Sequence, residues 1–177
     1  KERIGFVYAD NHFYDHLTVE QMKRVIASFY KQWDEDTFQH YRQQFDLPKN
    51  RKIKKLSRGM KVKFAIAVAL SHRADLIIMD EPTSGLDPVF RHEILDILAD
   101  VIQNEEKTVF FSTHITSDLE QIADFVTYID DGRIVFSEEK DRILEEYQIV
   151  KGANELLDAD TRQLFTGLRE TGVGFTG

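Results

Sequence analysis

The stretch from Leu76 to Asp87 reads Leu-Ile-Ile-Met-Asp-Glu-Pro-Thr-Ser-Gly-Leu-Asp and places two adjacent carboxylates after four large aliphatic side chains. Four apolar residues without polar alternation indicate a strand buried on both faces, as in the parallel sheet of an α/β protein. Asp80 can hold Mg²⁺ and Glu81 can polarise an attacking water at the edge of such a sheet, where phosphate ligands bind. The stretch therefore favours a nucleotide hydrolase. The alternative is that both acids cap the loop that Pro82 begins.

A second motif, Leu-Ser-Arg-Gly-Met at Leu56–Met60, precedes a segment with the apolar spacing of a helix, residues 61–71. Ser57 and Gly59 would then lie at a helix N-terminus, where free N–H groups and the helix dipole favour an anion. Gly59 would allow the backbone to approach a phosphate closely. The alternative is an ordinary serine N-cap.

A third motif is the apolar, β-rich run at Thr108–His114, which ends in Ser-Thr-His. If this strand lies beside the strand at residues 76–79, His114 emerges at the same sheet edge as Glu81. An imidazole there can bind a terminal phosphate or the attacking water. Alone, a histidine after a strand is usually a surface residue.

Together the three motifs closely resemble the nucleotide-binding domain of ATP-binding cassette (ABC) transporters, over roughly residues 4–146. The motif spacings, 24 residues from Ser57 to Glu81 and 33 from Glu81 to His114, are similar to the family's. The resemblance implies an α/β, P-loop NTPase-like fold: a mostly parallel sheet flanked by helices, with a small α-helical subdomain. It also implies ATP and Mg²⁺ as ligands.

The resemblance further assigns a role to each site residue. Ser57, Arg58 and Gly59 correspond to the signature motif, Asp80 and Glu81 to the Walker B motif, Asp87 to the D-loop and His114 to the switch histidine. Asp80 would hold Mg²⁺, Glu81 and His114 would be catalytic, and the signature residues with Asp87 would contact nucleotide across a head-to-tail dimer.

Two features depart from the family pattern. Arg58 and Met60 replace the third and fifth residues of the usual Leu-Ser-Gly-Gly-Gln signature, a form that resembles export-type or regulatory cassettes. Arg58 could add a charge-assisted contact to phosphate, or be a solvated arginine. The glutamine of the Q-loop falls at Ala9, or at Asp10 after a slip of one residue; only Asp10 could be a metal ligand.

No Gly-x-x-x-x-Gly-Lys-Ser/Thr loop occurs in the chain. Such a loop supplies the backbone cradle and the lysine for the β- and γ-phosphates. The resemblance places it before Lys1, which predicts a fragment that lacks the Walker A region, binds ATP weakly and is inactive alone.

Composition narrows the class of partner. The chain has a formal net charge of −8 and a sequence pI of about 5.2, which argues against nucleic-acid binding in spite of the basic run at residues 49–55. It has no cysteine, which fits a reducing compartment. No apolar stretch is long enough for a membrane span.

Other patterns predict the flanking elements. A capping box at Thr18 and Gln21 begins a helix expected to reach Trp33, and Asp34 or Asp36 caps the next. Further helices are expected after Pro88, at a Ser117-x-x-Glu120 box and at residues 138–147, with a hairpin turn at residues 130–132. The expected parts are residues 1–17 (Q-loop region), 18–72 (helical subdomain), 73–147 (Walker B to switch histidine) and 148–177 (start of a truncated C-terminal extension).

By this resemblance the protein is the ATP-hydrolysing subunit of an ABC transporter, of exporter type, on the cytoplasmic face of the membrane. Its partners would be an integral membrane subunit and a second ATP-binding subunit. The alternatives are a soluble cassette ATPase acting on ribosomes or nucleic acid, and a catalytically silent interaction module.

Overall fold

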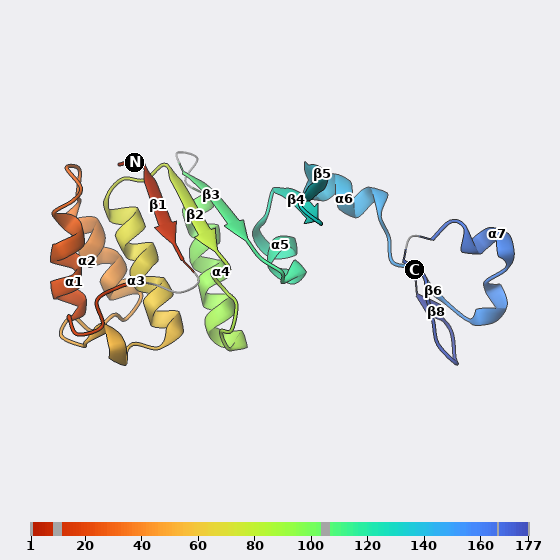
Figure 1. Ribbon diagram of the computed structural model, residues 1–177, viewed down its shortest axis with the longest axis horizontal. Helices are drawn as coiled ribbons and strands as arrows, with labels where there is room; N and C mark the ends of the chain where they lie inside the picture. Colours follow the sequence, from red (N-terminus) through yellow and green to blue (C-terminus); the bar gives the residue numbers. More distant parts are fainter. Residues whose placement is uncertain (1, 9–11, 104–106, 166, 177) are drawn as a thin grey trace. The chain divides into compact units, whose positions relative to one another are not determined.

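The computed structural model describes residues 2–8, 12–103, 107–165 and 167–176 (Figure 1). The chain forms two compact units, residues 1–122 and 123–177. The first unit holds a parallel sheet and its helices, and the second holds short antiparallel strands and two short α-helices. All of the predicted site residues that the structure describes belong to the first unit.

The sheet of the first unit has three parallel strands in the order β1 (Ile4–Val7), β2 (Leu76–Asp80) and β3 (Thr108–Ser112). Between β2 and β3 the register runs from Leu76 opposite Thr108 to Asp80 opposite Ser112. The expectation that these two strands are adjacent in the sheet is therefore confirmed. Because they are parallel, the residues that follow Asp80 and Ser112 leave the sheet at one edge.

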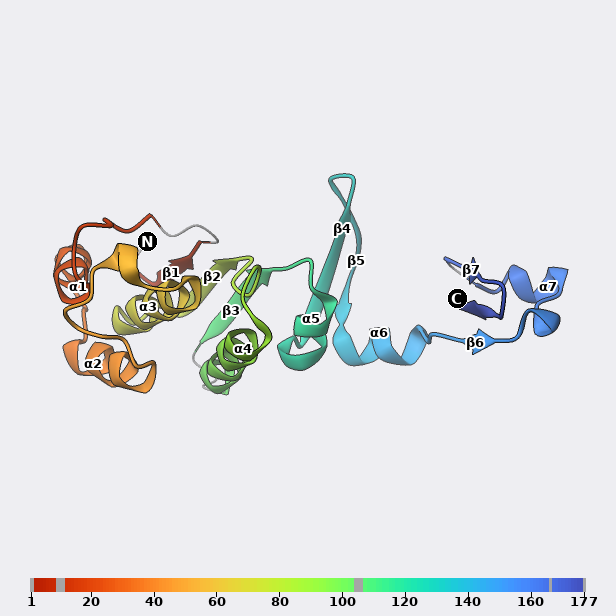
Figure 2. The same ribbon diagram turned by 90° about the horizontal axis from the view of Figure 1, so that it is seen from below.

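The two faces of the sheet differ in burial. Ile77 and Met79 are buried, whereas Leu76 and Ile78 are only half-buried. On the face shared with Ile78, Phe6 is 50% exposed and Phe110 62% exposed. The expectation that the strand is buried on both faces is therefore wrong for the described residues, because α3 and α4 pack on a single face of the sheet (Figure 2).

Helix α1 (Val19–Ala27) begins at the predicted capping box, in which Thr18 Oγ1 accepts from the Gln21 amide and the Gln21 side chain accepts from the Thr18 amide. The helix ends at Ala27, well before Trp33. At this end the Ser28 hydroxyl donates to the Val25 carbonyl, and the Phe29 amide donates to the Ile26 carbonyl instead of continuing the α-helical pattern. The next residue, Phe29, is 76% exposed.

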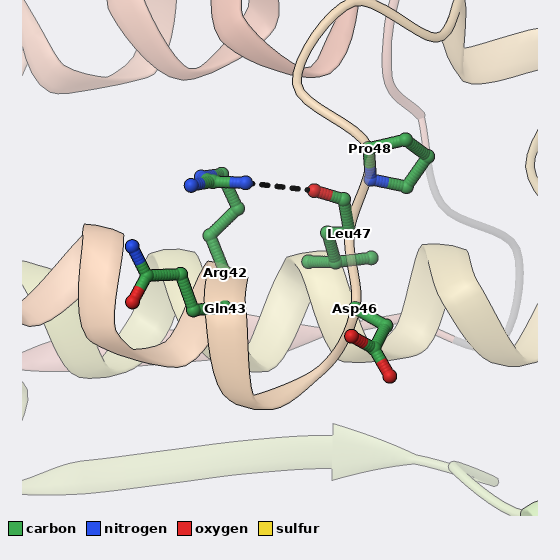
Figure 3. A pocket seen from close by; sticks show the side chains of 5 residues that line it. All are labelled: Arg42, Gln43, Asp46, Leu47 and Pro48. Atoms are coloured by element: carbon green, nitrogen blue, oxygen red, sulfur yellow. Dashed lines mark hydrogen bonds between the residues drawn. The ribbon is translucent and has the colours of Figure 1, made fainter.

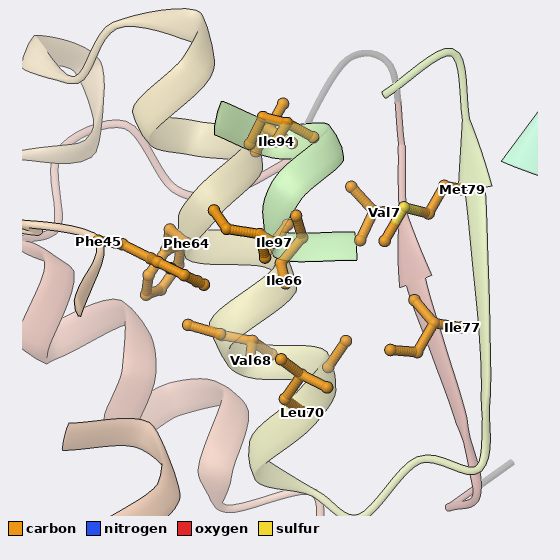
Figure 4. Packing of buried hydrophobic residues seen from close by; sticks show 14 of the residues in the cluster. Val7, Phe45, Phe64, Ile66, Val68, Leu70, Ile77, Met79, Ile94 and Ile97 are labelled. Carbon is orange, nitrogen blue, oxygen red and sulfur yellow. The ribbon is translucent and has the colours of Figure 1, made fainter. Parts of the chain in front are cut away.

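Helix α2 (Glu35–Gln44) is capped by Asp34, which accepts from the Thr37 amide. A 3₁₀ turn (η1, Ile53–Lys55) then leads into α3 (Arg58–Ser71). Ser57 lies at the N-terminus of this helix, as expected, and is its N-cap. Helix α3 is buried along nearly its whole length and forms the centre of the core between α2 and the sheet. Figure 4 shows Phe64, Ile66, Val68 and Leu70 of this helix facing the other buried side chains.

Helix α4 (Pro88–Ile102) begins with the predicted proline and follows an Asp87 N-cap. Helix α5 (Thr116–Ile122) begins one residue before Ser117, so the expected box at Ser117 and Glu120 does not start it. Ser117 lies inside the helix, and its hydroxyl instead accepts a hydrogen bond from Arg91.

The second unit opens with the predicted hairpin, β4 (Phe125–Asp130) and β5 (Arg133–Glu139), joined by Asp131 and Gly132 with φ of 45° and 73°. Helix α6 (Lys140–Glu146) starts two residues later than expected, because Glu138 and Glu139 pair with β4. Beyond it lie short elements around a three-stranded sheet of order β6-β8-β7: β6 (Lys151–Gly152), η2 (Asn154–Leu156), α7 (Ala159–Arg162), β7 (Arg169–Glu170) and β8 (Phe175–Thr176).

Within the described ranges, no helix combines the length and the apolar composition needed to cross a bilayer. The boundaries expected at residues 17, 72 and 147 remain predictions.

The close approach of β1 to α3 depends on Gly5. A Cβ atom at this position would lie 2.6 Å from the Ala69 Cβ. We expect Gly5→Ala to lower the free energy of unfolding by about 1–3 kcal/mol through overpacking, measured by urea denaturation. The double variant with Ala69→Gly should recover part of that loss, and strict additivity of the two substitutions would contradict the contact.

Candidate functional site

The paired carboxylates lie where β2 ends, beside the end of β3. Asp80 is the last residue of β2, and its Oδ1 accepts from the Ser112 hydroxyl at 2.8 Å. The amide of Glu81 donates to the Ser112 carbonyl at 3.1 Å and contacts the Ser112 hydroxyl at 3.2 Å. Ser112 therefore fixes the start of the loop that carries Glu81.

Glu81 and His114 face each other at this edge. Glu81 Oε2 lies 2.8 Å from His114 Nδ1, and the two side chains are 28% and 68% exposed. The structure therefore brings together two residues that are 33 positions apart in the sequence. Glu81 has a φ of 47°, a left-handed conformation that is unfavourable for a side chain with a Cβ and is common at functional sites.

The donor set suits Mg²⁺ better than a transition metal. The described residues contain no cluster of three or more His, Cys, Asp or Glu side chains placed to hold a metal. Mg²⁺ binds through one or two carboxylates and completes its shell with water and phosphate oxygens, so Asp80 alone could serve. Asp10 and Ala9, the other positions considered for the metal-sensing loop, lie outside the described residues.

The signature residues surround the start of α3. Ser57 Oγ accepts from the Met60 amide at 3.2 Å, and both Ser57 and Arg58 are exposed. Gly59 is buried, and a Cβ there would lie 3.1 Å from Cδ1 of Phe90 on α4. The glycine thus allows α3 and α4 to approach each other.

Asp87 ends the loop after Glu81 and caps α4. Its Oδ1 accepts from the amides of Val89 and Phe90 at 3.1 and 3.2 Å. The loop before it includes Gly85, with a φ of 67°, where a Cβ would come within 2.5 Å of Nη1 of Arg58. The Arg58 guanidinium therefore lies against the loop between Glu81 and Asp87.

A buried cation reinforces the junction of α3 and α4. Lys63 is only 4% exposed, forms an ion pair with Glu93 and places its ammonium 5.4 Å from the Phe90 ring centroid. A charge in such a place needs the partner that Glu93 provides. The starts of the two helices are thus held together close to Ser57 and Asp87.

Sequence reasoning missed a buried polar network behind the site. Asp118 is 0% exposed; its carboxylate accepts from the Thr83 hydroxyl and from Arg91 Nε, the latter at 2.6 Å. The only sequence signal is that Asp118 follows His114 by four residues, which does not distinguish a buried acid from a solvated one. Ser112 was missed as well, although its place at the end of a strand was visible.

A separate depression of about 350 Å³ lies at the end of α2 (Figure 3). It is lined by residues 42, 43 and 46–48, and Arg42 Nη1 donates to the Leu47 carbonyl across it at 3.2 Å. None of the predicted site residues lines it.

Comparison with known sequences places these residues in context. Residues 1–84 match the profile of a family described as "ABC transporter". The chain is 26% identical to the ABC transporter ATP-binding protein YtrB of Bacillus subtilis, over 83% of this chain and 50% of that protein. It is 30% identical to the bacitracin transport ATP-binding protein BcrA of Enterococcus faecalis, over 75% of this chain and 44% of that protein. The chain thus spans about half the length of these curated relatives.

Solved structures share the fold. CbiO1 from Clostridium perfringens, described as part of the ABC transporter complex cbiONQ, has a TM-score of 0.69 at 25% identity, over 82% of this chain and 60% of that one. An ATP-binding cassette solved as a dimer with ADP and Pi has a TM-score of 0.66 at 24% identity, over 77% of this chain and 62% of that one. The predicted P-loop NTPase-like fold class is confirmed.

The cap of α4 gives a stability prediction. Asp87→Ala removes the acceptor of two backbone amides and should lower the free energy of unfolding by about 1 kcal/mol. Asp87→Ser retains a capping hydroxyl and should stay within about 0.5 kcal/mol of the parent. Denaturant titration of the three proteins measures both values, and equal stability of the parent and the alanine variant would show that the cap contributes nothing.

Proposed function

The chain carries the sequence and fold of an ABC transporter ATP-binding domain, and from this we propose that the protein hydrolyses ATP to drive transport. The observation that supports this most strongly is the 2.8 Å contact between Glu81 and His114 beside Asp80, on strands adjacent in the sheet and distant in the sequence.

Each side chain at the edge can take a distinct part in phosphoryl transfer to water. Glu81 can hold the attacking water and accept its proton, because its carboxylate is partly exposed at the end of β2. His114 can keep that carboxylate oriented through Nδ1 and use its remaining ring nitrogen to bind a terminal phosphate. Asp80, fixed by Ser112, would hold Mg²⁺. When bound, the ion would neutralise charge on the phosphates.

The second part of the proposal concerns assembly. Ser57 and Arg58 are exposed at the N-terminus of a 14-residue helix, with a free dipole end and a guanidinium that favour phosphate. We infer that they contact ATP held by a second ATP-binding subunit, with Asp87 near the junction, so that binding closes a head-to-tail dimer and hydrolysis opens it.

The names of the relatives support a proposal for the direction of transport and for the membrane partner. The proteins similar to this chain include one named for bacitracin transport and one for lantibiotic transport. We propose an exporter whose cargo passes through an integral membrane subunit, with this protein peripheral on the cytoplasmic face. The Leu-Ser-Arg-Gly-Met form of the signature supports the same assignment.

Substitution of the proposed base tests the chemistry. In the complete protein with its membrane partner, Glu81→Gln should lower the rate of ATP hydrolysis by about 100-fold or more, because the amide cannot accept a proton. ATP-driven dimerisation should persist, since the substitution leaves the phosphate contacts in place. Steady-state phosphate release and size-exclusion chromatography with ATP measure the two properties.

The matched control is Asp96→Asn. It makes the same change, from a carboxylate to an amide, at an exposed position on α4. It should hydrolyse ATP at the parent rate. Turnover near the parent rate in the Glu81→Gln protein would refute the assigned role of this residue.

A further inference from the structure

Asp118 occupies an unusual place for an acidic side chain. It lies on α5, is 0% exposed and accepts two kinds of donor: the Thr83 hydroxyl on Oδ2 and Arg91 Nε on Oδ1, the latter at 2.6 Å. Thr83 is itself 1% exposed. A carboxylate buried this completely is stable only when its oxygens are bonded, and loss of one partner leaves an uncompensated charge.

The three segments that meet at Asp118 are those that carry the site. Thr83 follows Glu81 by two residues, Arg91 follows Asp87 by four, and Asp118 follows His114 by four. Each of the three hydrogen-bonded residues thus lies within about one helical turn, along the sequence, of a predicted site residue. Neither Thr83 nor Asp118 is exposed, so solvent and nucleotide do not reach their side chains.

Glu81 needs such support because its own backbone conformation is unfavourable. A φ of 47° is strained for a residue with a Cβ, and it persists only where the surroundings impose it. On one side Ser112 holds the Glu81 amide. On the other side the Ser84 amide donates to the Glu81 carbonyl at 3.2 Å. Thr83 lies between Glu81 and Ser84 in the sequence, and its hydroxyl donates to Asp118.

We propose that Asp118, acting through the Thr83 hydroxyl, is the positioning residue that keeps Glu81 facing His114 in the conformation required for hydrolysis. The inference rests on the proposed ATPase function and deepens it. Asp118 does not touch the substrate. It sets the orientation of a group that does, so its loss should reduce kcat and leave the KM for ATP nearly unchanged.

The test removes one hydroxyl and preserves the shape of the side chain. In the complete protein, Thr83→Val should lower kcat for ATP about 10- to 100-fold with KM within about threefold, as expected for a small misplacement of a catalytic group. Thr83→Ser, which restores the donor, should recover most of the rate. Ser117→Ala removes only the exposed hydroxyl bonded to Arg91 and should retain the parent rate.

A second measurement does not depend on turnover. The ¹⁵N resonances of the His114 ring, recorded at one pH, report its contact with Glu81, and Glu81→Gln gives the reference for loss of that contact. Thr83→Val should shift these resonances toward the Glu81→Gln position, whereas Thr83→Ser should not. If the parent protein shows no ATPase activity, the proposed function fails and the ring resonances still decide the inference.

Two results would overturn the proposal. One is a Thr83→Val protein with parental kcat and parental His114 resonances. The other is a Thr83→Val protein in which kcat falls and KM rises by the same factor while the His114 resonances stay in place. The contact between Glu81 and His114 would then not depend on the buried hydroxyl.

Discussion

The parallel register of β2 and β3 is the constraint on which the site depends. Asp80 pairs with Ser112, so Glu81 and the residues before His114 leave the sheet at the same level and on the same edge. A slip of one residue would turn the side chains of one strand to the opposite face and separate the carboxylate from the imidazole. The register is held by burial, because Ile77 and Met79 pack against helices on one face. The geometry of the candidate site thus follows from hydrophobic packing several residues away.

Much of this arrangement could be predicted from local sequence. The capping box at Thr18, the cap at Asp34, the helix N-terminus at Ser57, the proline at the start of α4 and the Asp-Asp-Gly turn each depend on a few neighbouring residues, and all appear in the structure. The meeting of Glu81 and His114 was predicted because two apolar runs ending in polar residues must end at one edge if they are parallel neighbours. Local chemistry and a single topological assumption were sufficient.

The remaining features depend on tertiary contacts that no local pattern contains. Helix α1 ends at Ala27, where the Ser28 hydroxyl bonds the Val25 carbonyl, and Tyr30 then packs on the distant His72 with ring centroids 4.0 Å apart. The half-buried state of Ile78 depends on which face the helices cover. Asp118 reads as a surface acid in a short polar helix, and only the approach of Arg91 and Thr83 shows that it is buried. Long-range charge pairs of this kind carry no periodic signal.

Tertiary contacts also join the residues that are proposed to face nucleotide. Ser57 and Asp87 cap two different helices, α3 and α4, whose N-terminal halves are joined by Gly59 against Phe90 and by the ion pair of buried Lys63 with the partly exposed Glu93. These packed side chains oppose independent motion of the two caps, and the buried Lys63 ammonium depends on its pairing with Glu93. Asp87 lies in the loop that begins at Glu81. A ligand that displaced the start of α3 would therefore also displace the segment that carries the Glu81 carboxylate. In the proposed function, these contacts connect the place where phosphate would be sensed with the place where water would be activated.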